Sequence, residues 1–280
     1  MFIEDLRLFL IPYELPNGDE RNQPRVEVET DEDRAALAVL LNVHDHRDLD
    51  DGVTDFMRNL IWSLGYEGRA VHEISLSQSD DSEERRFHRL FLLPSGPLLR
   101  VGGRYLQWVP SHARESRGMW MSIDGDRIWD LRIPRSLGRP VRQKRTIRRL
   151  ARLSLPAPEF AVRDLQKASR AGYDFQVYWR ESEIATARAT RTWGWSGRWA
   201  WRDFSTEYFQ FYREVKFRRS LAVLRNHLVS EMNDLFLRLG IRARMHLERK
   251  TPVADFDAGL ERLASGDWDF ARLREEGLTS

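Results

Sequence analysis

A long apolar stripe near the C-terminus places the strongest limit on the fold. Between residues 208 and 239, apolar side chains recur in steps of three and four, which is the period of one face of an α-helix. The pattern predicts a helix over 205–239, ended by Gly240 as its C-terminal cap. At about 1.5 Å per residue such a helix is roughly 50 Å long, so it must organise the C-terminal half of the chain. The stripe shifts register between Val215 and Phe217, and the two halves of the helix are therefore expected to face different neighbours.

The centre of the chain, from residue 69 to residue 133, consists of short runs rich in β-branched and aromatic residues. Turn residues separate these runs, among them Gly102-Gly103 and Asp124-Gly125, which predicts an antiparallel β-meander. Asp124-Gly125 predicts a type I′ hairpin, because Asp and Gly tolerate the positive φ angles of that turn. The polar segment 78–85 is expected to be a mobile loop between two strands.

Helical patterns lie on both sides of this β-rich centre. Acidic residues open predicted helices at 31–42 and 52–64, and Pro140 opens a basic helix over 140–154. Further helices are predicted at 159–171 and 174–189, then a strand near 242–247 and two short helices at the end. The fold class expected is α+β, with N-terminal helices, a central antiparallel β-meander and a helical C-terminal half built on one long helix. We expect two domains, 1–134 and 135–280.

Several functional classes are disfavoured by what the chain lacks. The 280 residues contain no Cys, which excludes disulfides, thiolate nucleophiles and zinc held by Cys. The first residues carry acids at Glu4 and Asp5 and no basic region, so they do not resemble a signal peptide. No apolar run approaches the roughly 20 residues of a membrane-spanning helix. We expect a soluble cytoplasmic protein that does not contact membranes.

Charge is strongly segregated along the chain although the net charge is only +2. Residues 1–84 hold 21 acidic and 7 basic side chains, whereas residues 85–153 hold 4 acidic and 17 basic ones. Lys occurs only at Lys144, Lys167, Lys216 and Lys250, so nearly all cations are Arg. A GC-rich coding sequence explains the bias equally well, but guanidinium groups also suit bidentate phosphate binding. The basic segment requires an anionic partner.

The predicted helix at 140–154 is the main candidate binding element. Arg142, Arg145, Arg149 and Arg152 share one face by their spacing, and Val141, Ile147, Leu150 and Ala151 form the opposite, packing side. No acid lies between Asp130 and Glu159. A nucleic-acid backbone is the favoured complement, and docking on an acidic protein surface or plain solvation are the alternatives. The candidate nucleic-acid-binding residues are Arg135, Arg139, Arg142, Lys144, Arg145, Arg148, Arg149 and Arg152.

A second candidate is the tryptophan-rich segment 191–204. If Ser196, Gly197 and Arg198 form a three-residue hairpin loop, the four indoles share one face of a two-stranded ribbon, where they could stack on bases or sugars. A two-residue loop would split them between the two faces. We favour the other interpretation, in which the ribbon covers a hydrophobic core. The possible stacking residues are Trp193, Trp195, Trp199 and Trp201.

Two kinds of short motif are similar to known metal-binding signatures. The order His44, His46, Asp48 is similar to the H-x-H-x-D motif of metallo-β-lactamase-like hydrolases, but Leu49 stands where that family carries a further His. The motif also follows a predicted helix instead of a strand, and a polar loop between two helices explains these residues better. We therefore predict no metal ion at this site.

Two E-x-K triplets, at 214–216 and 248–250, are similar to the second half of a metal-dependent nuclease signature. The first triplet falls inside the long predicted helix, where that signature does not occur. The second, Glu248 to Lys250, follows a strand-like run, and Asp234 is the available upstream acid. Since E-x-K is common by chance in a highly charged chain, a nuclease ranks only third.

The leading prediction is a non-catalytic subunit that binds DNA or RNA through the basic helix and contacts protein partners through its acidic N-terminal block and long helix. The alternative is a structural or adaptor subunit that uses complementary charged faces for protein assembly. Neither function requires a cofactor or a metal, and no catalytic residues are assigned.

Overall fold

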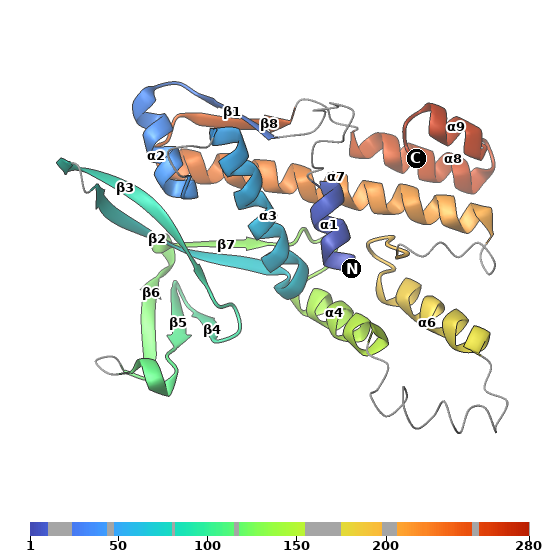
Figure 1. The fold of residues 1–280 in the computed structure, drawn as a ribbon, viewed down its shortest axis with the longest axis horizontal. Helices are drawn as coiled ribbons and strands as arrows, with labels where there is room; N and C mark the ends of the chain where they lie inside the picture. Colours follow the sequence, from blue (N-terminus) through green and yellow to red (C-terminus); the bar gives the residue numbers. More distant parts are fainter. Residues whose placement is uncertain are drawn as a thin grey trace. The chain divides into compact units, whose positions relative to one another are not determined.

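The computed structural model describes residues 1–10, 24–43, 48–79, 82–114, 118–154, 175–197, 206–247 and 252–279 (Figure 1). Within these residues the fold is α+β, as predicted, with helices near the N-terminus, three small antiparallel sheets and a long helix in the C-terminal half. Across the same ranges, no helix is both long and apolar enough to span a bilayer.

The chain forms two compact units, each assembled from separate stretches of sequence. The helical unit comprises Met1–Leu10, Pro134–Arg225 and Lys250–Ser280, and the sheet unit comprises Ile11–Ile133 and Asn226–Arg249. The chain passes from the sheet unit to the helical unit after residue 133, close to the boundary expected from sequence. Whether 1–134 and 135–280 are independent domains stays a prediction.

The sheet unit contains all eight described strands and the two acidic helices. Strand β1 pairs antiparallel with β8, so segments more than 200 residues apart in sequence lie side by side, with Pro24 opposite Leu247. The elements are β1 (Pro24–Val28), α2 (Asp31–Leu41), α3 (Leu49–Glu67), β2 (Arg69–Ser79), β3 (Ser82–Leu93), β4 (Leu98–Val101), β5 (Arg104–Trp108), η1 (Ser111–Ala113), β6 (Trp120–Asp124), η2 (Gly125–Arg127), β7 (Ile128–Arg132) and β8 (Ala243–Leu247).

Helices α2 and α3 confirm the predictions at 31–42 and 52–64, although α3 extends further at both ends. The Thr30 hydroxyl accepts a hydrogen bond from the Asp33 amide at 3.1 Å and so caps α2 at its N-terminus. Asp48 caps α3 in the same way by accepting from the Leu49 amide at 2.7 Å. Gly68 ends α3 with a φ of 71°, the left-handed conformation typical of helix C-terminal caps.

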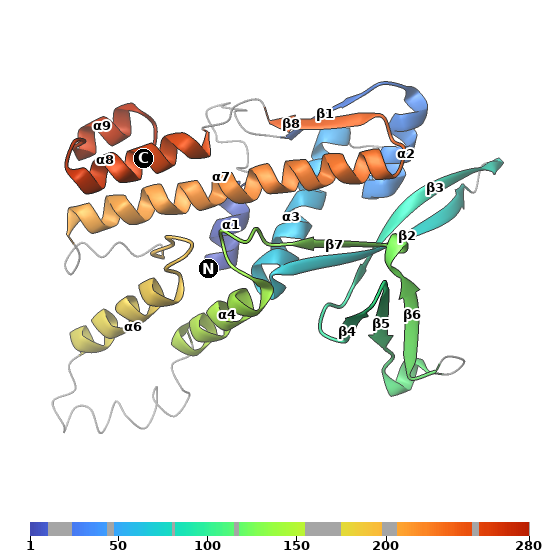
Figure 2. The same ribbon diagram turned by 180° about the vertical axis from the view of Figure 1, so that it is seen from behind.

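The central strands are antiparallel, as predicted, but they divide between two sheets of three strands each instead of forming one continuous meander (Figure 2). One sheet has the order β3-β2-β7 and the other the order β4-β5-β6. Strands β6 and β7 flank Asp124-Gly125, yet β6 pairs with β5 and β7 pairs with β2. The turn between them is the short 3₁₀ segment η2, and Asp124 has a φ of −65°, so the predicted type I′ hairpin is also wrong.

Gly125 allows a close contact between two backbone segments instead of forming the predicted type I′ turn. Its amide donates to the carbonyl oxygen of Gly103 at 2.9 Å, and a Cβ atom at position 125 would lie only 2.4 Å from that oxygen. The glycine therefore permits a close backbone approach instead of a positive φ angle. The chain then leaves one sheet for the other, with Ile123 and Ile128 on either side of the turn buried in the same cluster.

The predicted mobile loop at 78–85 is likewise wrong for most of its length. Strands β2 and β3 continue through this segment, with Gln78 opposite Arg86 and Ser79 opposite Ser82. Backbone pairing thus extends far beyond the apolar part of the hairpin, although the polar composition is typical of loops.

The helical unit is built on the first part of α7 (Glu207–Arg238), which confirms the long predicted helix. A cluster of buried side chains joins α7 to the two closing helices, which confirms that prediction as well: Phe211, Val215, Ala222, Phe256, Leu263, Leu273 and Leu278. The remaining elements are α1 (Phe2–Leu10), α4 (Pro140–Ser154), α6 (Phe175–Ala189), α8 (Val253–Ser265) and α9 (Phe270–Glu275). The helix predicted at 159–171 lies outside the described residues.

Candidate anion-binding site

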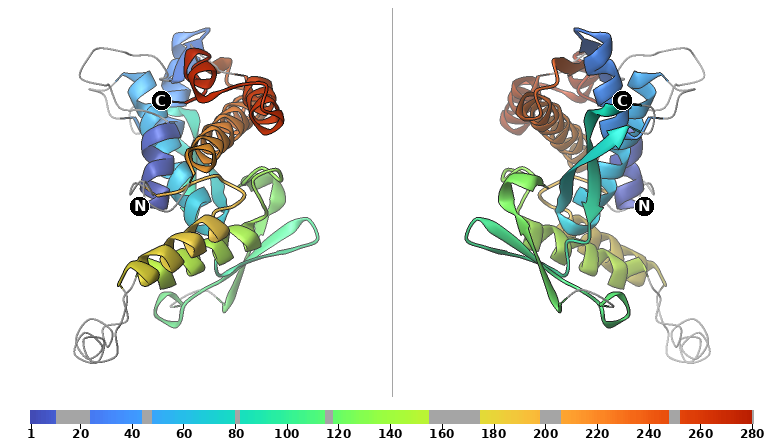
Figure 3. Two further views of the ribbon diagram at one scale, coloured as in Figure 1. Left: turned by 90° about the vertical axis from the view of Figure 1, so that its right-hand side faces the viewer. Right: turned by 90° about the vertical axis from the view of Figure 1, so that its left-hand side faces the viewer.

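Helix α4 carries an exposed row of arginines, as predicted from its spacing. The helix lies beside α6 (Figure 3). The sequence of α4 contains no acidic residue. Within the described part of the chain, none of six arginines on α4 and the turn before it pairs with a carboxylate, and we call these six the α4 arginine row: Arg135, Arg139, Arg142, Arg145, Arg148 and Arg149. Lys144 is half-buried, and the side chain of Arg152 lies outside the described residues.

The packing side of α4 differs from the one expected. Val141 is 63% exposed and Ala151 is also exposed, whereas Ile147 and Leu150 are half-buried. The most buried side chains are Gln143 and Thr146, both polar. The helix is rotated toward these residues because each finds a hydrogen-bond partner in the interior.

Trp193 joins α4 to the segment that follows α6. Its indole N–H donates to the Gln143 side-chain oxygen at 3.0 Å, and its ring lies edge-on to Phe2 of α1 at 5.6 Å between centroids. Thr146 adds a second link by donating to the carbonyl oxygen of Ala189 at 3.3 Å. Three elements of the helical unit therefore meet at one buried tryptophan.

The predicted tryptophan ribbon is wrong in its first arm, since residues 190–194 form turns and not a strand. Trp193 and Trp195 are both buried, which confirms the core interpretation for these two and removes them as stacking residues. The Trp195 indole donates to the Asp5 carboxylate at 2.8 Å. Trp199 and Trp201 lie outside the described residues.

Gly194 and Arg213 connect the turn of residues 190–194, which follows α6, to α7. Gly194 has a φ of 83°, and a Cβ atom there would lie 2.6 Å from the backbone nitrogen of Phe217, so only glycine allows the close approach. The buried Arg213 guanidinium donates to the Thr190 hydroxyl at 2.9 Å and to the carbonyl oxygen of Trp195. Burial lowers the pKa of Arg213 to about 10, which leaves the side chain charged at neutral pH.

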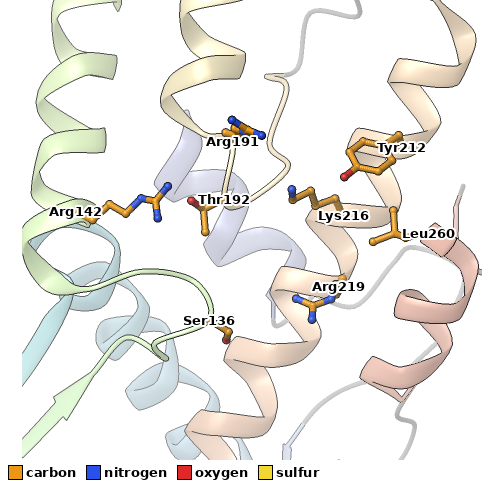
Figure 4. A pocket seen from close by; sticks show the side chains of 8 residues that line it. All are labelled: Ser136, Arg142, Arg191, Thr192, Tyr212, Lys216, Arg219 and Leu260. Carbon is orange, nitrogen blue, oxygen red and sulfur yellow. The ribbon is translucent and has the colours of Figure 1, made fainter. Parts of the chain in front are cut away.

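A pocket of about 420 Å³ opens where α4, the turn, α7 and α8 meet (Figure 4). Arg142 reaches into it from α4, and Lys216 reaches in from α7 on the opposite side, with Thr192 of the turn between them. We call it the cationic pocket, and its lining residues are Ser136, Arg142, Arg191, Thr192, Tyr212, Lys216, Arg219 and Leu260.

The charges of the cationic pocket are poorly balanced. Arg219 forms a two-point ion pair with Asp257, whose second contact is 3.2 Å long, so this cation is largely neutralised. Arg142, Arg191 and Lys216 have no carboxylate partner in the described ranges. The Lys216 ammonium lies 5.6 Å from the centre of the Tyr212 ring. Three cations and three hydroxyl groups face one cavity, which suits an oxyanion that accepts several hydrogen bonds.

Most lining residues of the cationic pocket were not identified from the sequence. The sequence patterns place Arg191 only at the start of the tryptophan-rich segment 191–204, and Lys216 only within an E-x-K triplet. Tyr212, Lys216 and Arg219 follow helical spacing and share one face of α7, which was a readable signal. Their convergence with Arg142 and Thr192 depends on tertiary packing.

The candidate metal motifs gain no support from the described residues. Asp48 caps α3, and Asp50 accepts from the Val26 amide at 2.9 Å. Glu214 pairs with Arg218 one turn along α7 at 3.0 Å. His44, His46, Glu248 and Lys250 lie outside the described residues, within which no group of three or more His, Asp or Glu could hold a metal ion. The absence of a metal requirement stays a prediction.

The sequence was also compared with known proteins, and neither a protein-family model nor a curated protein matches it.

Proposed function

We propose that this protein is a non-catalytic nucleic-acid-binding subunit that holds the phosphate backbone on the α4 arginine row. One observation carries the proposal: six exposed arginines without acidic partners in the described residues lead directly, through Arg142, into the cationic pocket. Protein partners bound through the acidic N-terminal block and α7, and a cytoplasmic location, belong to the same proposal.

Physical chemistry supports a polyanion as the ligand of the α4 arginine row. Arginines at three- and four-residue spacing present guanidinium groups along one side of a helix, at intervals that can follow successive phosphates. Each neutralised phosphate of duplex DNA contributes about 0.9 to the slope of log affinity against log salt concentration. A row that engages four to six phosphates therefore gives a slope of roughly −4 to −5.

The experiment is a titration of labelled single-stranded DNA, duplex DNA and RNA by fluorescence anisotropy between about 50 and 200 mM salt. We expect Arg142→Glu, Arg145→Glu and Arg149→Glu together to reduce affinity at least about 100-fold and to flatten the salt dependence. The oligonucleotides should remain full-length when Mg²⁺ is present.

The matched control replaces three exposed arginines of the sheet unit with Glu: Arg34→Glu, Arg89→Glu and Arg244→Glu. These arginines also lack carboxylate partners among the described residues. This variant has the same net charge as the α4 variant and should retain most of the binding. Equal loss in both variants would mean that net charge alone, and not the α4 arginine row, attracts the nucleic acid.

A protein-assembly role remains the second candidate, and the outer face of the β4-β5-β6 sheet favours it. Leu99, Val101, Trp108 and Trp120 are 39–58% exposed there, and Trp108 lies directly opposite Trp120. Exposed apolar clusters of this kind are typical of interaction surfaces. A photo-crosslinking residue at Val101 should then yield a discrete protein adduct in cells, whereas the same residue at Arg34 should not.

A further inference from the structure

We propose that the cationic pocket binds a terminal phosphate, that is, the phosphomonoester at one end of the nucleic acid held on the α4 arginine row. This inference rests on the proposed function and assigns a separate task to the pocket. The row contacts internal phosphates without regard to their position, whereas the pocket recognises the end of the strand.

The charge of the pocket favours a monoester over a diester. Arg142, Arg191 and Lys216 bring three positive charges to the cavity, and no acidic side chain is among its lining residues. A phosphomonoester carries about −1.5 to −2 charges at neutral pH, whereas an internal phosphodiester carries one. The terminal group therefore gains more Coulomb attraction from the same three cations.

The geometry of the pocket also favours a terminal phosphate over an internal one. Its cations come from three separate elements, namely α4, the turn after α6, and α7, so a bound phosphate is contacted from several sides (Figure 4). An internal phosphate needs two open sides for its covalent neighbours, but a terminal phosphate needs only one. The volume of about 420 Å³ lies within the usual range for small-ligand sites.

The remaining lining residues complement a nucleotide end. The hydroxyl groups of Ser136, Thr192 and Tyr212 are hydrogen-bond donors for phosphate or sugar oxygens. Leu260 and the Tyr212 ring add an apolar wall for the terminal sugar or base. Phosphate donors and an apolar wall thus occur together in one cavity.

The backbone positions that carry the cations adjoin buried residues of the core. Arg142 precedes the buried Gln143, Arg191 and Thr192 precede the buried Trp193, and Lys216 follows the buried Val215. Each basic side chain therefore extends from a backbone position that the core of the helical unit fixes. Pre-organised donors lose less conformational freedom when they bind, which favours a specific site over loose surface attraction.

The test compares three oligonucleotides of one sequence, with a 5′-hydroxyl, a 5′-phosphate or a 3′-phosphate end, by fluorescence anisotropy. We expect at least one phosphorylated end to bind tenfold or more tightly than the hydroxyl end. Arg191→Gln and Lys216→Gln together should remove this preference while leaving affinity for the unphosphorylated oligonucleotide within threefold. Lys216→Arg should retain the preference, which separates loss of the charge from loss of folding.

Two further variants separate the pocket from the α4 arginine row. Arg145→Gln with Arg149→Gln should lower the affinity for all three oligonucleotides by a similar factor and leave the ratio of the three affinities unchanged. Arg188→Gln, an exposed change on α6 three residues before Arg191, should alter neither affinity nor ratio.

The outcomes distinguish this inference from the proposed function. Binding without any preference for a phosphorylated end would overturn the pocket assignment and leave the nucleic-acid proposal standing. A preference that survives the double pocket variant would also overturn it. Failure of the parent protein to bind any of the three oligonucleotides would overturn the proposed function itself.

Discussion

Buried polar contacts help to hold the walls of the cationic pocket together. Gln143 accepts from Trp193, and Arg213 donates to Thr190 and Trp195 from a position that is only 4% exposed. In the described residues every hydrogen-bond partner of Arg213 is a neutral oxygen, so its charge is not cancelled by a carboxylate. Loss of any such buried partner costs more than the bond itself contributes, because the other group remains desolvated.

His72 illustrates how burial alone determines a protonation state. The ring is 5% exposed and lies against two aromatic rings, Phe56 at 5.8 Å and Trp129 at 5.4 Å between centroids. Within the described residues its Nδ1 atom has no hydrogen-bond partner. Burial lowers the pKa of His72 to about 4, because the charged imidazolium is poorly solvated there.

We expect this histidine to make the stability of the protein depend on pH. The folded pKa is about 4 and the ordinary value is 6.5, so the unfolded chain takes up the proton first as the pH falls. The stabilising contribution is complete above pH 6.5 and is lost toward pH 4, and it amounts to about 3 kcal/mol. Urea unfolding of the parent and of His72→Gln between these pH values provides the measurement. Parallel pH profiles for the two proteins would show that His72 does not titrate in this way.

At the scale of single elements, α7 shows what a periodic pattern specifies and what it leaves open. Most of the predicted stripe is buried between Phe211 and Leu235, which confirms the helix and most of its apolar face, whereas Tyr208 at its start is 43% exposed. The two ends of the helix do face different neighbours, because residues up to Arg225 belong to the helical unit and those from Asn226 to the sheet unit. The register shift in the sequence predicts the change of neighbours near Val215. In the structure the change of unit comes ten residues later, after Arg225.

The burial of α7 leads to a prediction with a control on the same helix. Leu224 and Leu228 are no more than 1% exposed, and Leu237 is 80% exposed. Leu224→Ala and Leu228→Ala should each lower the free energy of unfolding by about 2–5 kcal/mol, since each leaves a cavity in a packed interior. Leu237→Ala should change it by less than about 0.5 kcal/mol. Urea unfolding monitored by circular dichroism tests all three, and equal midpoints would contradict the assigned burial.

At the scale of the whole molecule, the acidic block and the α4 arginine row belong mainly to different units. The acidic block of residues 1–84 lies mostly in the sheet unit, and the α4 arginine row lies in the helical unit. Such a block either competes with nucleic acid for the basic surface or binds a basic partner, because unpaired like charges forgo favourable Coulomb energy. We favour the partner, since the acids of 80–84 belong to a segment whose sequence is too polar to pack.

The two possibilities differ in what happens when the acids are removed. Changing Asp80, Asp81, Glu83 and Glu84 to Ser should leave nucleic-acid affinity at low salt unchanged and weaken assembly with the protein partner. Anisotropy at about 50 mM salt and co-purification from cells measure the two effects, since screening is weak at that ionic strength. Tighter nucleic-acid binding by the variant would instead show that the block competes for the basic surface.

The sequence by itself determined the α+β class, nearly all the described helices and the exposed arginine row on α4. These features follow from local periodicity, capping residues and the spacing of charges, all of which are set by residues close together in the sequence. It also placed β8, but it did not reveal the partner strand β1 from the opposite end of the chain.

Only the tertiary structure decided which strands pair, which side of α4 packs and where the cationic pocket forms. Asp124-Gly125 is a strong local hairpin signal, yet Gly125 packs closely against Gly103 and the strands on either side of it pair in different sheets. The pocket joins Arg142, Arg191 and Lys216, which are far apart in sequence and meet because Trp193 and Gly194 seat the turn against its neighbours. Such contacts depend on packing between distant segments, which no local pattern encodes.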